Sequence, residues 1–229
     1  MRFNMLSLIA FATTWSLVSA HTVITYPGWR GDTLKTNDDF PYGMQWEYPC
    51  GGLPVTKNRT NWPITGGAIA LQPGWFRGHH TAFFYINMGY SNDLSVDILG
   101  GPPNMSFPMM PVFQITGPTN EKYDGTICLP QVPLPVNSTA RIGDNVTIQV
   151  VEVAVHGASL YNCVDVTLTD PKDVDRVTPE NCFNSTDISF NTVFSTADVT
   201  SAAAPLTSTF ANYLGLTPLI LVTLFSIFS

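Results

Sequence analysis

Short runs of apolar and β-branched residues recur along the chain, separated by Pro-Gly, Gly-Gly and Asn-Asp turn signals. No segment shows the 3.6-residue apolar period of a long helix, and strands at this spacing are typical of a β-sandwich. The runs that predict strands are His21–Tyr26, Ala68–Leu71, Thr81–Met88, Leu94–Ile98, Gly125–Leu129, Asn145–Val155 and Ala158–Leu168. We therefore expect an all-β fold with few and short helices.

One of these runs carries a carboxylate on a rigid element. Alternation within Ala158–Leu168 puts Tyr161, Cys163 and Asp165 on the face opposite the core. An acid in so apolar a strand needs either a partner or an exposed face, because burying an unpaired charge is costly. Asp165 is accordingly either a solvent-facing residue or a member of a site.

Residues 1–20 have the features of a secretory signal peptide. Arg2 supplies a positive charge ahead of an apolar stretch, and small residues precede a cleavage point after Ala20. A membrane anchor is the alternative, but the stretch is short and lacks flanking charges. Cleavage would make His21 the first residue of the mature chain.

The C-terminal end carries a second processing signal. Residues 213–229 form an apolar tail that no basic residue follows, whereas a membrane-spanning tail normally has cytoplasmic basic residues. A small-residue triplet, a mildly polar spacer and an apolar end together indicate a GPI anchor. We expect attachment at Ser201, with Ala202 and Ala203 as alternatives, and a tail-anchoring helix is the other interpretation. The expected segments are a signal peptide (1–20), a β-sandwich domain (21–187), a Ser/Thr/Ala-rich stalk (188–203) and a removed propeptide (204–229).

The composition fits a secreted protein, which the GPI signal would hold on the outer leaflet of the plasma membrane. The 229 residues carry a net charge of −7 and no cluster of Lys or Arg, which argues against nucleic-acid binding. Four cysteines in an oxidising compartment indicate two disulfides; they are Cys50, Cys128, Cys163 and Cys182. Five N-x-[ST] sequons predict glycosylation, at Asn58, Asn104, Asn137, Asn145 and Asn184.

Histidines are the candidate metal ligands. An N-terminal His21 offers two nitrogens to one ion, the α-amine and ring Nδ1, and this chelate exists only after signal cleavage. A second imidazole completes a T-shaped set of three nitrogens, which suits Cu(II). The alternative is that His21 only marks where the peptidase cuts.

The second imidazole could come from either residue of a pair. His79 and His80 stand at a loop-to-strand junction, a usual place for site residues. Neighbouring side chains on an extended chain point opposite ways, so one of the two would face His21. Both could also be plain surface residues. His156 lies in a turn, where we expect a structural or supporting role.

Together these motifs resemble the GPI-anchored fungal copper-acquisition factors, which share the fold of lytic polysaccharide monooxygenases. The matching segments are His21-Thr22-Val23, Tyr48-Pro49-Cys50-Gly51-Gly52, Asn58-Arg59-Thr60-Asn61-Trp62-Pro63, His79-His80 leading to Asn87-Met88-Gly89, Gly125-Thr126-Ile127-Cys128-Leu129-Pro130, Thr147-Ile148-Gln149-Val150-Val151 and Leu160-Tyr161-Asn162-Cys163-Val164-Asp165. The resemblance covers roughly residues 21–169 and both processing signals.

The resemblance implies an immunoglobulin-like β-sandwich that holds one copper ion at an edge. It implies that an Asp joins the two histidines, and the matching residue is Asp165. Counting back from Asn87-Met88-Gly89 favours His79 over His80, although Thr81 departs from the family's Pro-Trp. By the same analogy, the disulfides would be Cys50–Cys163 and Cys128–Cys182.

Two functions then compete. A carboxylate on the metal favours Cu(II) and occupies coordination space, which opposes the redox cycling that oxidative polysaccharide cleavage needs. We therefore expect a non-enzymatic, monomeric protein that captures copper at the cell surface, with a plasma-membrane copper transporter as one conceivable recipient. A copper-dependent polysaccharide monooxygenase acting on wall glycans is the alternative, and a metal-free wall-adhesion module is a third interpretation.

Overall fold

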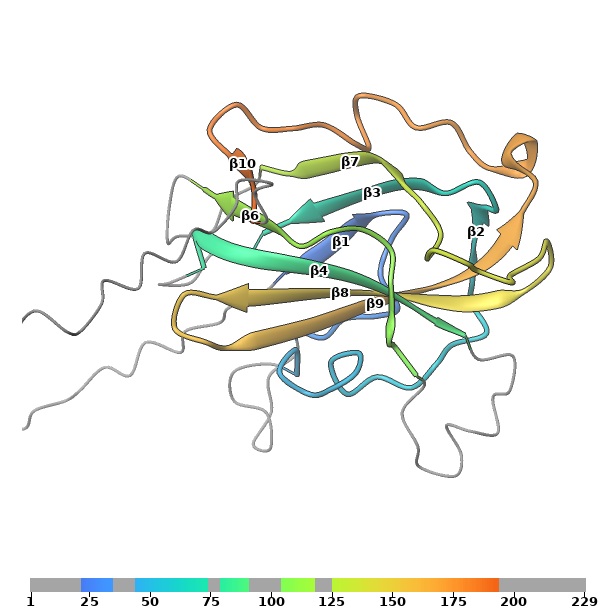
Figure 1. Cartoon of the computed structure of the whole chain (residues 1–229), viewed down its shortest axis with the longest axis horizontal. Helices are drawn as coiled ribbons and strands as arrows, with labels where there is room; N and C mark the ends of the chain where they lie inside the picture. Colours follow the sequence, from blue (N-terminus) through green and yellow to red (C-terminus); the bar gives the residue numbers. More distant parts are fainter. Residues whose placement is uncertain (1–21, 35–43, 74–78, 91–103, 118–124, 194–229) are drawn as a thin grey trace, which may run out of the picture. The chain divides into compact units, whose positions relative to one another are not determined.

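Two β-sheets form the protein in the computed structural model, which describes residues 22–34, 44–73, 79–90, 104–117 and 125–193. The smaller sheet has the order β1-β3-β7 and the larger has the order β10-β6-β4-β8-β9-β2, with β5 paired to β4 (Figure 1). The strands are β1 (Val23–Tyr26), β2 (Thr60–Pro63), β3 (Gly67–Gln72), β4 (Thr81–Tyr90), β5 (Phe107–Pro108), β6 (Phe113–Thr116), β7 (Ile127–Val132), β8 (Asn145–Ala154), β9 (Ser159–Thr169) and β10 (Ser189–Thr192). The expected β-sandwich is confirmed.

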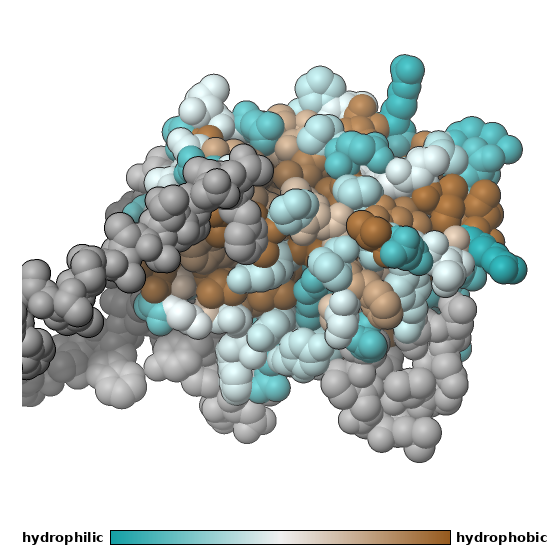
Figure 2. Space-filling view, in the orientation of Figure 1, coloured by the Kyte–Doolittle hydropathy of each residue, from teal (hydrophilic) through white to brown (hydrophobic). Residues whose placement is uncertain are grey.

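The core lies between the two sheets and follows the alternation of the strands. Leu71 of the small sheet is completely buried together with Phe84, Ile148 and Leu168 of the large sheet. Along each strand, the residues that alternate with the core positions face outward. Phe83 and Tyr85, on either side of Phe84 in β4, are 39% and 40% exposed. On the side drawn in Figure 2, apolar residues lie among polar ones.

Helices contribute little to the described part of the chain. One 3₁₀ turn, η1, spans Pro171–Asp173, and Asp170 caps it by accepting a hydrogen bond from the backbone N–H of Lys172. The described ranges hold no helix that is long and apolar enough to cross a membrane.

The pairing in the centre of the large sheet defines which residues share a face. β4 and β8 run antiparallel, and β8 pairs antiparallel with β9 so that Val150 lies opposite Asn162 and Thr147 lies opposite Asp165. Val150 packs in the core, so Asn162 faces the core as well. Asp165 is an odd number of residues from Asn162 and therefore faces away from the core.

Both disulfides form with the pairing that the resemblance implies. Cys50–Cys163 ties the loop before β2 to β9, and Cys128–Cys182 ties β7 to the segment after η1. The two bonds close separations of 113 and 54 residues. Each disulfide therefore fastens a long irregular segment to a strand.

The folded domain extends further than the sequence pattern indicates. The sequence predicts a Ser/Thr/Ala-rich stalk from residue 188, outside the β-sandwich domain, but Ser189–Thr192 forms β10 and pairs with β6. Phe190 of β10 also stacks on Phe113 of β6, with ring centroids 5.0 Å apart. The predicted strand Leu94–Ile98 lies outside the described residues, and so do the signal peptide, His21, Ser201 and the C-terminal tail.

Candidate metal centre

The candidate site begins with His79, which lies two residues before the start of β4 and is completely buried. Its Nδ1 lies 2.7 Å from Oε1 of Glu152, whose side chain is also fully buried. A carboxylate accepts hydrogen bonds, so Nδ1 of His79 donates this one. In the neutral ring the lone pair then lies on Nε2, the atom through which a so-oriented imidazole binds a metal ion.

Glu152 is a residue of the candidate site that the sequence reasoning missed. It lies on β8 with the parity of Ile148 and Val150, both of which face the core. An acid at a core-facing position needs a partner, because an unpaired buried charge is costly. That alternation was visible in the sequence, and it would have singled out Glu152 as a residue in need of a cation or a histidine.

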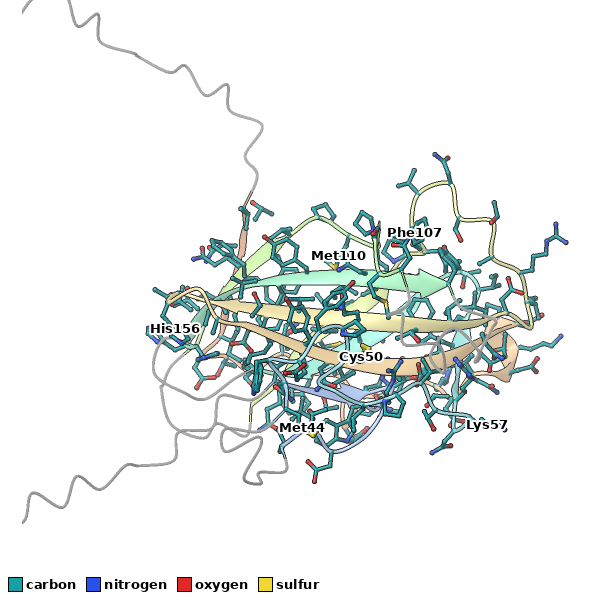
Figure 3. The ribbon with its side chains drawn as sticks, turned by 90° about the horizontal axis from the view of Figure 1, so that it is seen from below. Met44, Cys50, Lys57, Phe107, Met110 and His156 are labelled. Carbon is teal, nitrogen blue, oxygen red and sulfur yellow. A yellow bond between two sulfur atoms is a disulfide. The ribbon has the colours of Figure 1, made fainter. Side chains whose placement is uncertain are left out.

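His156 is the second residue that the structure brings to His79. It lies in the tight turn between β8 and β9, and its Nε2 stands 3.2 Å from Nε2 of His79. The turn is set by Gly157, whose φ of +91° favours glycine. Figure 3 shows His156 at one end of the sandwich. This contact could not be predicted from sequence spacing, because the two histidines are 77 residues apart.

His80 does not share the environment of His79. It is half-buried, whereas His79 is fully buried. Its backbone carbonyl accepts a hydrogen bond from the N–H of Gly117, which fixes the start of β4 against the end of β6. Of the two candidates for the second imidazole, His79 is the one that contacts Glu152 and His156, and these three residues form the His79 cluster.

The first described residue of the chain is held firmly at this end of the fold. The Thr22 backbone exchanges two hydrogen bonds with the Gln45 side-chain amide, at 2.8 and 2.6 Å. The Thr22 carbonyl also accepts a hydrogen bond of 2.7 Å from Nδ2 of Asn162 on β9. Asn162 lies opposite Val150, so Glu152 is two residues, about 7 Å, further along β8 and on the same face. Thr22 is thereby anchored on the face of the large sheet that carries Glu152.

Asp165 occupies a different part of the molecule. Its carboxylate accepts hydrogen bonds from Nε and Nη2 of Arg30, at 2.8 and 2.7 Å. The Thr147 hydroxyl donates to it at 2.6 Å and the Thr56 backbone N–H at 3.0 Å, so both oxygens have two partners. The side chains of Arg30 and Asp165 are 3% and 0% exposed. This is a buried ion pair that fastens two loops to the outer face of β9.

The register of the sheet separates Asp165 from His79. Asp165 pairs with Thr147, whereas His79 contacts Glu152, which is five residues further along β8. Five residues of a strand correspond to about 17 Å, and an odd separation places the side chains of Asp165 and Glu152 on opposite faces of the sheet. Figure 3 shows Lys57, the neighbour of Thr56, far from His156. The structure therefore does not meet the expectation that Asp165 joins His79 in one ligand set.

Within the described residues, no three His, Cys, Asp or Glu side chains converge on a point that could hold a metal ion. The reason is geometric, because Glu152 contacts Nδ1 of His79 while His156 contacts Nε2 on the opposite edge of the ring. The described part of the site thus offers two imidazole nitrogens that face each other. A site with more nitrogens requires donors from beyond the described ranges.

Four of the five sequon asparagines are exposed, which are Asn58, Asn104, Asn137 and Asn184. Asn145 is half-buried, and its Oδ1 accepts a hydrogen bond from the Thr167 hydroxyl. Glycosylation at the five sites stays a prediction.

Comparison with known proteins gives a consistent set of matches. The family model described as copper acquisition factor BIM1-like matches residues 19–187. The lytic polysaccharide monooxygenase-like protein X325 of Aspergillus fumigatus is 57% identical over 209 residues, 84% of each chain. The lytic polysaccharide monooxygenase-like protein ham-7 of Neurospora crassa is 56% identical over 225 residues, 93% of this chain and 95% of the relative.

Among solved structures, a cellulose-active polysaccharide monooxygenase from M. thermophila matches 73% of this chain and 90% of its own. The TM-score is 0.38 and the sequence identity 13%.

Proposed function

Since the chain belongs to the family of BIM1-like copper acquisition factors, we propose that it captures Cu(II) at the cell surface through His21 and His79. The observation that supports this most directly is the setting of His79. The buried carboxylate of Glu152 holds the His79 ring so that Nε2 faces His156. Metal-binding histidines are oriented in this way in proteins generally.

The N-terminal residue completes the proposed ligand set. His21 precedes Thr22 by one peptide bond, and the Thr22 backbone is anchored by Gln45 and Asn162 on the face that carries Glu152. One residue spans about 3.8 Å between Cα atoms, so an anchored Thr22 restricts where the α-amine and ring of His21 can reach. Signal cleavage after Ala20 would free that amine.

The donor set fits copper. Two imidazoles and one amine are nitrogen donors, and copper has the highest affinity of the divalent first-row ions for such sites. We leave Asp165 out of the ligand set, because four hydrogen bonds from Arg30, Thr147 and Thr56 already use both of its oxygens. The proposed site therefore has no carboxylate on the metal that would oppose redox turnover.

We propose copper acquisition and not polysaccharide oxidation on the ground of the family match. The relatives named lytic polysaccharide monooxygenase-like leave oxidation as the second candidate. In our proposal the protein is held on the cell surface by a GPI lipid and delivers copper to a membrane transporter. The cargo is then bound and released without chemical change to a substrate.

Copper binding and turnover can be tested on one preparation. The mature protein, beginning at His21, is loaded with one equivalent of Cu(II) and examined by EPR, beside variants His79→Ala and His80→Ala. We expect loss of the wild-type spectrum in His79→Ala only, because His80 is outside the cluster. With ascorbate and hydrogen peroxide, the loaded protein should release no oxidised sugars from cellulose or chitin. Copper-dependent release of such products would favour the monooxygenase.

A further inference from the structure

We propose that His156 is also a copper ligand, so that the ion is held by three imidazoles and not by two. This inference rests on the proposed function, since it concerns the same site. It starts from a contact that no family motif in the sequence describes, the 3.2 Å approach between Nε2 of His79 and Nε2 of His156.

The hydrogen bonds around the two rings define what each nitrogen carries. Nδ1 of His79 donates to Glu152, which leaves a lone pair on Nε2. Nδ1 of His156 accepts a hydrogen bond of 3.4 Å from the backbone N–H of Ala158, so the proton of the neutral His156 ring is on Nε2. The metal-free pair is therefore joined by a hydrogen bond from His156 to His79.

The same separation suits two ligands of one ion. Imidazole nitrogens bind first-row divalent metals at about 2.0–2.1 Å. Two nitrogens 3.2 Å apart at that bond length subtend an angle of about 100° at the ion, between the cis angle of a tetragonal site and the tetrahedral angle. The rings are inclined by 68° with centroids 5.0 Å apart, so they meet edge to edge and do not stack. To bind through Nε2, the neutral His156 ring must carry its proton on Nδ1, so metal binding moves that proton and gives up the 3.4 Å hydrogen bond from the Ala158 N–H.

His156 and His79 differ in solvent exposure, so we expect them to act at different stages of metal capture. His156 is exposed on the turn, whereas His79 is fully buried. An ion arriving from solvent contacts His156 first. The turn is held by two hydrogen bonds, from Gly157 N–H to Ala154 and from Ala154 N–H to Ala158. His156 is thus a solvent-side ligand on a short hairpin tip, in the place where a recipient protein would exchange a ligand.

The competing explanation is that His156 only donates a hydrogen bond to His79. Two variants separate the two roles. His156→Ala removes both the ligand and the hydrogen bond. His156→Gln keeps an N–H donor of similar reach but removes the imidazole. Because the residue is exposed in a turn, neither variant leaves a cavity in the core. His80→Ala is the matched control that removes a neighbouring imidazole outside the cluster.

The decisive experiment counts imidazoles on Cu(II) by pulsed EPR, using the full mature protein with Cu(II) alone. We expect three imidazoles in the wild type and in His80→Ala, and two in both His156 variants. The Cu(II) affinity of both His156 variants should fall by about tenfold or more. An equal count in wild type and His156→Gln would overturn the proposal, since a hydrogen bond alone then explains the contact.

A His79→Ala variant distinguishes this failure from failure of the proposed function. If His79→Ala loses the wild-type spectrum while His156→Ala keeps it, the two-histidine site stands and His156 is not a ligand. If His79→Ala binds Cu(II) like the wild type, the site itself is misplaced, and the inference about His156 falls with it.

Discussion

The buried carboxylate of Glu152 should control the copper affinity of His79 without touching the ion. Replacing Glu152 by Gln keeps the side-chain volume and an oxygen that can accept the bond from Nδ1. It removes the negative charge that lies 2.7 Å from that nitrogen. A neutral partner makes the ring a weaker base and orients it less firmly, so the lone pair on Nε2 binds a cation less strongly.

The size of the effect follows from the kinds of hydrogen bond exchanged. A bond to a charged group contributes about 1.5–3 kcal/mol and a neutral one about 0.5–1.5 kcal/mol, so the exchange costs about 1 kcal/mol. Loss of a partner that orients a ligand costs about 10–100-fold in metal affinity, or about 1.4–2.7 kcal/mol. Glu152→Gln should therefore lower Cu(II) affinity by about tenfold or somewhat more.

Competitive titration of Cu(II) against a chelator of known affinity measures this change. Glu152→Leu serves as the harsher variant, because it leaves the buried Nδ1–H of His79 without an acceptor and should also lower the free energy of unfolding by about 1–3 kcal/mol. Unchanged affinity in Glu152→Gln, combined with loss of binding in His79→Ala, would refute the reasoning that Glu152 tunes the ligand.

Three further predictions concern the parts of the molecule around this site. Asp165→Asn should lower the free energy of unfolding in urea by about 3–5 kcal/mol, because it leaves Arg30 buried without its counter-ion; Cu(II) affinity should stay within about threefold of the wild type, since Asp165 lies about 17 Å along the sheet from Glu152 and on the opposite face. A chain that ends at residue 187 should unfold more easily, by at least about 1 kcal/mol, than one that ends at residue 193, because it lacks β10 and the Phe190–Phe113 stack; equal stability would show that β10 contributes nothing. Phosphatidylinositol-specific phospholipase should release the protein from cells, and retention in the membrane fraction would contradict the GPI anchor.

The strands that could be predicted are those with clear alternation. Both faces of β9 follow from the sequence, and Asp165 lies on the face that the pattern gives it. Its partner could not be predicted, because Arg30 is 135 residues away and reaches it from a loop. An ion pair buried under a loop and a ligand on a polar face produce the same sequence pattern. Only the contacts of the carboxylate distinguish them.

Two other features had weak or missing signals. All four residues of β10 are exposed, and the strand is held by backbone pairing to β6 and by one aromatic stack. A strand of this kind has no alternation of apolar and polar residues from which it could be predicted. The contact between His79 and His156 depends on how β8 and β9 meet at their turn, which is a matter of register. The disulfide pairing did follow from the resemblance, since the cysteines occupy the family's positions.

The measurement that tests the central claim most directly is the Cu(II) affinity of the mature protein beginning at His21 beside a version with one extra Ala before it. The added residue turns the α-amine of His21 into a peptide nitrogen and removes the N-terminal chelate, while His79, Glu152 and His156 stay unchanged. Our account predicts a loss of most of the affinity and an altered EPR spectrum. Equal affinity and an identical spectrum for the two proteins would contradict it.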